Sequence, residues 1–169
     1  EVRYVDWVLP GVLAMNMMFS CLFGVGYVSV RYRKNGMLKR LRATPLTPLE
    51  FLAAQIGSRL WLVLGTSVVV FAGTDLFIRF TMKAGWHFLV PILFLVFALG
   101  AISLISLGVT IAARTTSEEL AGGLLNLLSW PMMFLSGIWF SLEGVHPWVR
   151  AFAQILPLTH VIDAARAIM

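Results

Sequence analysis

Residues 7–42 read WVLPGVLAMNMMFSCLFGVGYVSVRYRKNGMLKRLR. The first 24 of them, Trp7 to Val30, carry no charged side chain, whereas the next 12, Arg31 to Arg42, carry six cations and no acid. A helix rises about 1.5 Å per residue, so about 20 apolar residues cross a hydrocarbon core of about 30 Å. Lys and Arg beside a span are retained on the cytoplasmic side. The stretch therefore predicts a transmembrane helix with a cytoplasmic C-terminal end.

The composition extends this prediction to the whole chain of 169 residues. Hydrophobic residues make up 59% and charged residues 12%, against about 25% charged in an average soluble domain. A soluble core cannot absorb so much apolar surface, so we expect an integral, multi-pass protein in contact with lipid. The net charge is +5, but seven of the 13 cations lie between Arg31 and Arg59. Cations clustered beside a span indicate membrane topology, and no nucleic-acid partner is expected.

Hydropathy predicts an all-α transmembrane bundle as a single domain over residues 1–169, with four spans. They cover about 7–30, 60–78, 88–113 and 120–140. Eight cations lie on the side that contains residues 31–59 and five lie on the other, so both ends of the chain are predicted to face outward. Tryptophans fall at the predicted outer ends, where amphipathic rings favour the headgroup region: Trp7, Trp86, Trp139 and Trp148.

The second span has a predicted start well before its most apolar part. Thr47, Pro48 and Glu50 place a hydroxyl at the N-cap, a proline at the first helical position and an acid at the third, which together form a capping box. A helix from Pro48 to Ile78 would have 31 residues and a length of about 46 Å. Its first turns are therefore predicted at the cytoplasmic interface.

Residues 36–43 predict a short amphipathic helix on the membrane surface just before that capping box. Apolar side chains recur at i, i+1 and i+4 with cations between them: Met37, Leu38, Lys39, Arg40, Leu41 and Arg42. The segment ends at Pro45, since the residue before a proline disfavours helix.

The tail, residues 145–169, is too interrupted for a simple span. Pro147 suits the start of one helix that ends before Pro157, and a second helix is expected over 159–169. In that second helix His160, Asp163 and Arg166 recur along one face. We expect an outer helical hairpin, either re-entrant or interfacial. If it enters the membrane, its broken backbone must be covered by protein or by a water-filled cavity.

Few polar side chains lie inside the spans. Those of the first and fourth predicted spans are Asn16, Ser20, Asn126 and Ser129. A buried amide in lipid needs a partner, so these residues are expected to face the bundle interior or a pathway. Either role, helix–helix contact or pathway, is compatible with the sequence.

Residue patterns that would indicate an enzyme are absent or weak. No GxxxxGK[ST] run occurs, so the chain does not hold ATP by that route. Glu118 and Glu119 are adjacent and match the first turn of a helix. His146, His160 and Asp163 form only a loose outer group. We expect no catalytic residue, no metal site and no cofactor in this chain.

Two ordered motifs give the chain a family resemblance. Residues 36–51 read GMLKRLRATPLTPLEF; residues 134–140 read FLSGIWF, followed by PW at 147–148 and LPLTHVIDAAR at 156–166. The chain resembles, over essentially its whole length, the membrane-spanning subunit of a type-2 ATP-binding-cassette (ABC) exporter. Family members often carry acids around the glycine at position 36, where this chain has Lys34, Asn35 and Lys39.

The resemblance implies six spans, of which this chain would hold the second to the fifth. It also implies that residues 36–43 form the coupling helix on a separate ATPase that binds ATP and Mg, and that the outer hairpin closes the pathway. A second permease copy, as a homodimer, and a bacterial inner membrane are further implications, with the first and fourth spans lining the interface. Family members export drugs, polysaccharides, lipo-oligosaccharides and other amphiphiles, and no residue here selects among them. A membrane-embedded enzyme and a structural or assembly protein without transport activity remain the alternatives.

Overall fold

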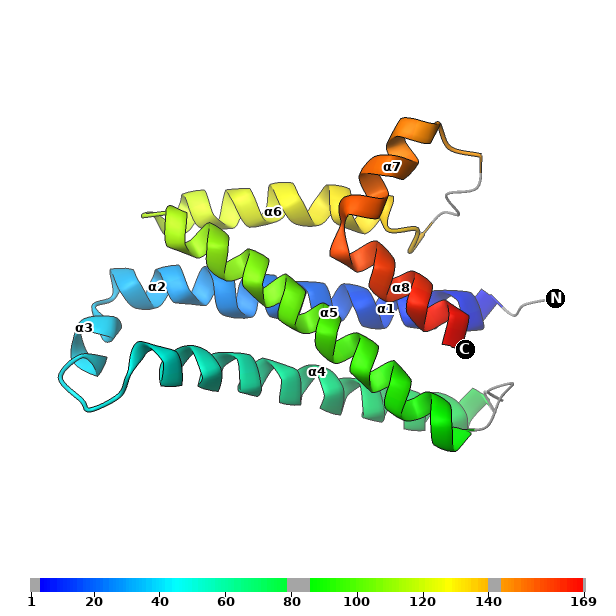
Figure 1. Cartoon of the computed structure of the whole chain (residues 1–169), viewed down its shortest axis with the longest axis horizontal. Coiled ribbons are helices and arrows are strands. Elements are labelled where there is room, and N and C mark those ends of the chain that lie inside the picture. Colours follow the sequence, from blue (N-terminus) through cyan, green and yellow to red (C-terminus); the bar gives the residue numbers. More distant parts are fainter. Residues whose placement is uncertain (1–3, 79–85, 140–143, 169) are drawn as a thin grey trace.

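The computed structural model describes residues 4–78, 86–139 and 144–168, and its regular elements there are all helical. They are α1 (Tyr4–Cys21), the π-helix η1 (Leu22–Tyr27), α2 (Val28–Lys34), α3 (Met37–Leu41), α4 (Pro48–Ile78), α5 (Trp86–Arg114), α6 (Glu118–Leu135), α7 (Pro147–Ile155) and α8 (Pro157–Ile168). The long helices form a bundle, with α3 at one end and the α7–α8 pair toward the other (Figure 1). This confirms the predicted all-α class.

Three helices are long and apolar enough to cross a membrane: Val8–Lys34, Pro48–Val70 and Val90–Arg114. They correspond to the first three predicted spans. The fourth predicted span, residues 120–140, overlaps α6, which has 18 residues and two acids in its first turn. By length and composition α6 is not among the three. Helix α6 ends at Leu135, and residue 140 lies outside the described part of the chain.

Helix α4 begins where the capping box predicted. The Thr47 backbone N–H donates to Glu50 Oε2 at 2.7 Å, and the Glu50 N–H donates to Thr47 Oγ1 at 3.3 Å. Two N–H groups at the helix start thereby gain partners. The helix then runs the predicted 31 residues to Ile78. Trp61 and Val69 on its outer side are 81% and 71% exposed, so lipid or another subunit must cover that side.

The first span contains a feature that hydropathy did not predict. Helices α1 and α2 are joined through η1, six residues with π-helical hydrogen bonding around Gly24 and Gly26. A Cβ on Gly26 would lie 2.9 Å from the carbonyl oxygen of Gly108 in α5. Because glycine has no side chain, the backbones of η1 and α5 approach closely there. The π-helix therefore sits at the tightest described crossing of the two spans.

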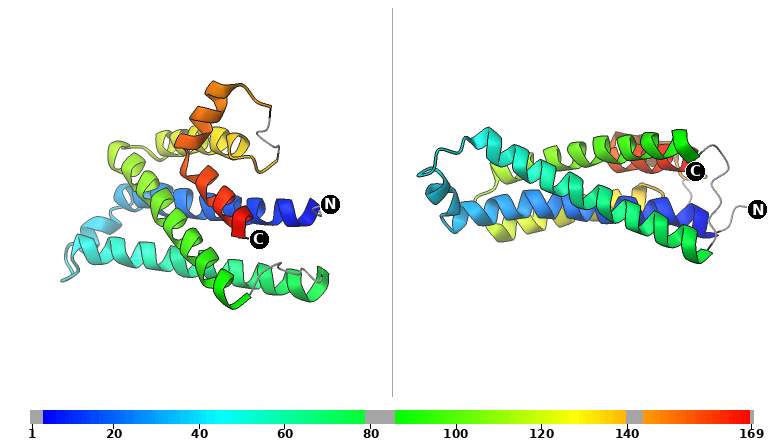
Figure 2. Two further views of the ribbon diagram at one scale, coloured as in Figure 1. Left: turned by 45° about the vertical axis from the view of Figure 1, so that its right-hand side comes forward. Right: turned by 90° about the horizontal axis from the view of Figure 1, so that it is seen from below.

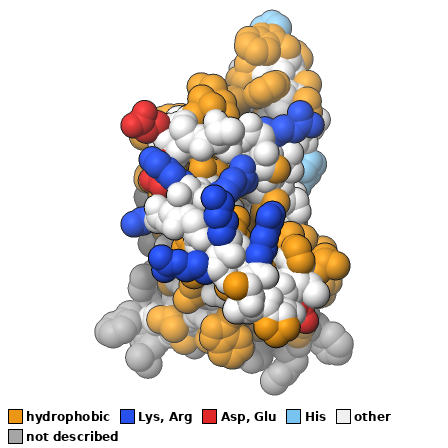
Figure 3. All heavy atoms as spheres, turned by 90° about the vertical axis from the view of Figure 1, so that its left-hand side faces the viewer, with side chains coloured by type: hydrophobic (Ala, Val, Ile, Leu, Met, Phe, Trp, Pro, Cys, Tyr) orange, Lys and Arg blue, Asp and Glu red, His pale blue; other side chains and the backbone are white. Residues whose placement is uncertain are grey.

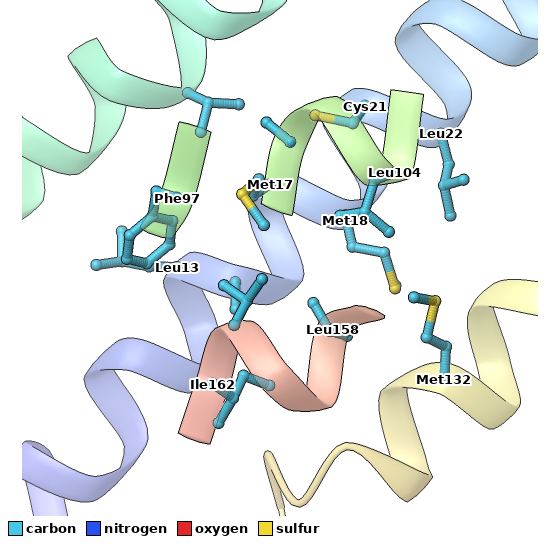
Figure 4. Close-up of a cluster of buried hydrophobic side chains, with 14 of the residues drawn as sticks. Leu13, Met17, Met18, Cys21, Leu22, Phe97, Leu104, Met132, Leu158 and Ile162 are labelled. Atoms are coloured by element: carbon cyan, nitrogen blue, oxygen red, sulfur yellow. The ribbon is translucent and has the colours of Figure 1, made fainter. Parts of the chain in front are cut away.

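The core lies where α8 meets α1, α5 and α6. Leu158 and Ile162 of α8 enter the same buried cluster as Met17, Phe97 and Met132 (Figure 4). Helix α8 buries a stripe with helical spacing, as predicted for its apolar face: Leu158, Thr159, Val161, Ile162 and Ala165. The second hairpin helix is therefore an integral part of the bundle.

The two ends of the bundle differ in character. Helix α1 begins and α8 ends at the same end, and α3 lies at the opposite end (Figure 2). Lys and Arg side chains gather on the face at the α3 end (Figure 3). The structure thus separates the basic segment 31–42 from the α7–α8 hairpin by the length of the spans.

Candidate functional site

Helix α3 is held in a reversal of the chain between α2 and α4. Gly36 precedes it with φ of 69°, a left-handed conformation that glycine adopts without steric cost. The Lys39 and Arg40 N–H groups donate to the Gly36 carbonyl oxygen at 3.1 and 3.2 Å. The first helical turn is thus fixed on the glycine, and α3 lies at the end of the bundle between two long helices.

The two faces of α3 have different surroundings. Leu38 and Leu41 are half-buried and line a cavity between α3 and its neighbours. Met37, Lys39, Arg40 and Arg42 are exposed. The predicted amphipathic helix is present, and its leucines face the bundle. The surface that α3 offers to a partner therefore consists mainly of cations.

The turn between α5 and α6 is tied to the first span at the same end. Arg33 Nη1 donates to the Thr115 carbonyl oxygen at 3.1 Å, and Nη2 donates to that of Ala112 at 2.6 Å. A cation at a helix C-terminus satisfies free carbonyls and complements the helix dipole. Tyr27 Oη donates to Glu118 Oε2 at 3.3 Å. These bonds bring the ends of α2, α5 and α6 together behind α3.

A second arginine connects α4 to the π-helix inside the bundle. Arg59 Nη2 donates to the Gly24 carbonyl oxygen at 3.0 Å, and a Cβ on Gly24 would collide with the guanidinium. Arg59 Nε is buried without a hydrogen-bond partner among the described residues. A π-helix shifts backbone hydrogen bonds by one residue. The Gly24 carbonyl in η1 thereby accepts from α4, a contact that hydropathy gives no means to predict.

The predicted pathway residues separate into two groups. Asn16 and Asn126 are exposed, and neither has a hydrogen-bond partner within the described chain. Ser20 is half-buried. Ser129 is buried, and its Oγ donates to the Leu125 carbonyl oxygen at 2.7 Å. This placement favours helix packing for Ser129, and it leaves the two amides on the outside of the bundle.

Two of the predicted outer hairpin residues, His160 and Arg166, each bond α8 to a different neighbouring segment. His160 Nε2 donates to the Gln154 carbonyl oxygen of α7 at 2.6 Å. Arg166 Nη2 donates to that of Gly137, in the turn after α6, at 2.9 Å. Burial lowers the pKa of the Arg166 guanidinium, and the charge of Asp163 opposes this change. Within the described ranges, no three His, Cys, Asp or Glu side chains are placed to hold a metal ion.

Helices of membrane length, with a basic helix exposed at one end, define a multi-pass membrane protein. The chain belongs to the ABC-2 type transporter family, whose model matches residues 2–169. This family membership confirms the resemblance that the two sequence motifs gave, to the membrane-spanning permease subunit of an ABC transporter.

The chain is also similar in sequence to several named permeases and related proteins. The chain is 26% identical over 163 residues to the inner membrane transport permease YhhJ of Escherichia coli (strain K12), covering 94% of this chain and 42% of YhhJ. It is 28% identical over 171 residues to nodulation protein J of Neorhizobium galegae, covering 99% and 63%. It is 23% identical over 169 residues to the daunorubicin resistance ABC transporter permease protein DrrB1 of Streptomyces coeruleorubidus, covering 99% and 58%.

The chain spans about half the length of the curated relatives it matches. No solved structure gives a significant match.

Proposed function

We propose that the full-length protein forms the membrane pathway of an exporter and that α3 transmits ATP hydrolysis from a separate ATPase subunit to the spans. The observation that carries this proposal is the exposed face of α3, where the cations Lys39 and Arg40 lie with Met37, at the end where the Lys and Arg side chains gather. ATP and Mg would be held by the ATPase. Because α3 is basic, its docking surface is expected to be acidic.

The same proposal treats α6 as a fourth span. Its 18 residues rise about 27 Å, close to the hydrocarbon thickness. It runs beside η1, α1, α2 and α5. Leu125 and Met132 enter the main buried cluster, and Ala121 packs with Val30 of α2 and Ala112 of α5. At the α3 end, Glu118 in its first turn accepts from Tyr27 Oη, and Arg33 donates to the Thr115 carbonyl oxygen just before the helix. The span is therefore anchored at its polar end and is apolar along most of the rest, with Asn126 and Ser129 as polar side chains within it.

A homodimer completes the proposed pathway. Asn16 of α1 and Asn126 of α6 are exposed amides without partners in the described chain. An amide against lipid is costly, so a second copy or a water-lined route should cover both. Inner-membrane location is proposed from YhhJ.

Copurification tests the function. The full-length permease is expressed with an ABC ATPase encoded beside it, purified through a tag on the permease and reconstituted in liposomes. We expect the ATPase to copurify and its turnover to rise several-fold with the permease. An ATPase variant that lacks the P-loop lysine should bind equally and hydrolyse nothing. An ATPase that neither copurifies nor responds would exclude the proposed coupling.

A further inference from the structure

We propose that the cavity behind α3 binds one acyl chain of an anionic phospholipid, with its phosphate held by Arg42. The cavity has a volume of about 260 Å³ and is bounded by α2, α3, α4 and α5. Its lining is mainly apolar and includes Leu38, Leu41, Phe51 and Val109. Nothing in the docking role of α3 requires such a space.

The lining has a polar end and an apolar end. Phe51 and Leu52 lie one turn into α4, and Val109 lies more than one turn before the end of α5, so both helices contribute residues from within candidate spans. Arg33 and Arg42 come from α2 and from the segment after α3, where the chain leaves the spans. An occupant must therefore be hydrophobic at one end and tolerate cations at the other.

The two arginines on the lining favour an anionic group at the polar end of the cavity. Both ionisable groups on the described lining are arginines, and none of its residues is acidic. Two of the Arg33 N–H groups already donate to the Ala112 and Thr115 carbonyl oxygens. The Arg42 guanidinium has no partner in the described chain, so all its donors are available. An Arg guanidinium matches phosphate oxygens in a bidentate geometry.

The volume of the cavity favours one part of an amphiphile over the whole molecule as its occupant. Pockets that enclose a whole small ligand have volumes of roughly 300–1,000 Å³, and this cavity is smaller. A single acyl chain is thin and flexible enough to enter such a space, and the mainly apolar lining disfavours a sugar. Phospholipid is also the amphiphile that surrounds the spans at all times. Basic residues beside a span attract anionic lipid by about 1 kcal/mol each.

The probe is phosphatidylglycerol with a photoreactive diazirine on one acyl chain. The full-length permease is placed in nanodiscs of phosphatidylcholine that contain this lipid, irradiated and digested, and the adducts are located by mass spectrometry. We expect adducts on Phe51, Leu52 or Val109. Arg42→Gln should reduce them about fivefold, because the phosphate then loses its charged hydrogen-bond partner in the cavity.

Two further variants separate the cavity from general charge attraction. Lys34→Gln removes an exposed cation from the same end that does not line the cavity, and adduct yield should stay unchanged. Ala113→Trp adds an indole at an exposed lining position, which should fill the space and abolish the adducts without unfolding the bundle. A thermal-shift measurement on each variant confirms folding.

Three results would overturn the proposal. Equal labelling by diazirine-phosphatidylcholine would show that the anionic headgroup is not selected. Adducts confined to the outer faces of α4 and α5 would show a lipid belt without a site. An equal loss in Lys34→Gln and Arg42→Gln would show unspecific attraction. The proposal rests on the membrane placement above but not on an ATPase, because labelling uses the permease alone. Its failure and that of the coupling proposal are thus distinguishable.

Discussion

Gly24 and Gly26 lie two residues apart in η1, but a Cβ added to each would meet different atoms. A Cβ on Gly26 would lie 2.9 Å from the Gly108 carbonyl oxygen and 3.1 Å from its Cα. A Cβ on Gly24 would meet the Arg59 guanidinium, which is the far end of a flexible side chain. Backbone atoms of a packed helix cannot move aside cheaply, whereas a guanidinium can. The two glycines should therefore differ in how well they tolerate substitution.

Gly26→Ala should lower the stability of the full-length protein by about 1–3 kcal/mol, because it forces η1 and α5 apart. The measurement is thermal unfolding in detergent, followed by the solvent exposure of Cys21, which is buried in the core. Gly123→Ala in α6 is the matched control, since its Cβ would meet nothing within 4 Å. An equal melting temperature for Gly26→Ala and wild type would contradict the close crossing.

Single residues show what the sequence could and could not predict. The Thr47–Glu50 capping box was predictable because its partners lie three residues apart. The Arg59–Gly24 bond joins residues 35 positions apart, so it depends on how two helices pack. The exposure of Asn16 and Asn126 also depends on packing, because both amides lie in spans that could have turned either way.

Helix α3 carries the coupling proposal at the scale of an element. Five residues are too few for hydropathy to fix which face turns toward the bundle. The structure turns Leu38 and Leu41 inward and leaves Lys39 and Arg40 exposed. Contact with an ATPase should thus depend more on charge than on the leucines.

Replacing Lys39 and Arg40 together by Glu should weaken ATPase association about tenfold, with a larger effect at low salt, because complementary charges steer association. The affinity is measured by titrating the ATPase onto permease in nanodiscs. Arg150→Glu in α7, an exposed cation distant from α3, is the charge-reversal control. If Lys39→Glu/Arg40→Glu binds like Arg150→Glu, α3 is not the docking element.

The positions of most helices could be predicted from the sequence. The bounds of α4 and the break before Pro157 follow from local signals, a capping box and two prolines. The π-helix was not predictable, since one additional residue in a turn leaves apolar content unchanged. The burial of α8 was only half expected: its apolar face was predicted, but its position within the bundle depends on residues of α1 and α5.

At the scale of the whole molecule, the amides of Asn16 and Asn126 are exposed on the outer surface of the bundle, where they would face lipid if the subunit were alone. The α6 surface beside Asn126 also carries large apolar side chains, with Leu127 71% and Trp130 55% exposed. A mixed surface of this kind suits contact with a second copy along a route for an amphiphile. The sequence alone favoured helix–helix contact over a pathway role for these asparagines, whereas their exposure in the structure supports the pathway role that we propose.

Asn16→Leu and Asn126→Leu should each alter substrate-stimulated ATPase activity or substrate preference, while the yield of folded permease stays near that of wild type. If the amides instead join helices, stability should fall by roughly 0.5–2 kcal/mol and all substrates should be affected alike. Thr66→Val is the control, because Thr66 is exposed in α4 but its Oγ1 already donates to the Leu62 carbonyl oxygen at 2.7 Å. Unchanged activity and stability in both variants would remove the asparagines from the mechanism.

The π-helix also affects how this segment tolerates insertions and deletions. Removing one residue from 22–27 would restore regular α-helical hydrogen bonding and leave the span long enough to cross the membrane. The flanking helices would keep nearly their present register, because a π-turn holds one residue more than an α-turn and the deletion removes that extra residue. Asn16 would keep its present face, and Arg33 its position at the end of α5. A one-residue deletion in the regular part of α1 would instead rotate everything before it by about 100° and shift it by about 1.5 Å. The span should thus tolerate a one-residue gap within η1, whereas the same gap elsewhere would exchange the side chains presented to the partner.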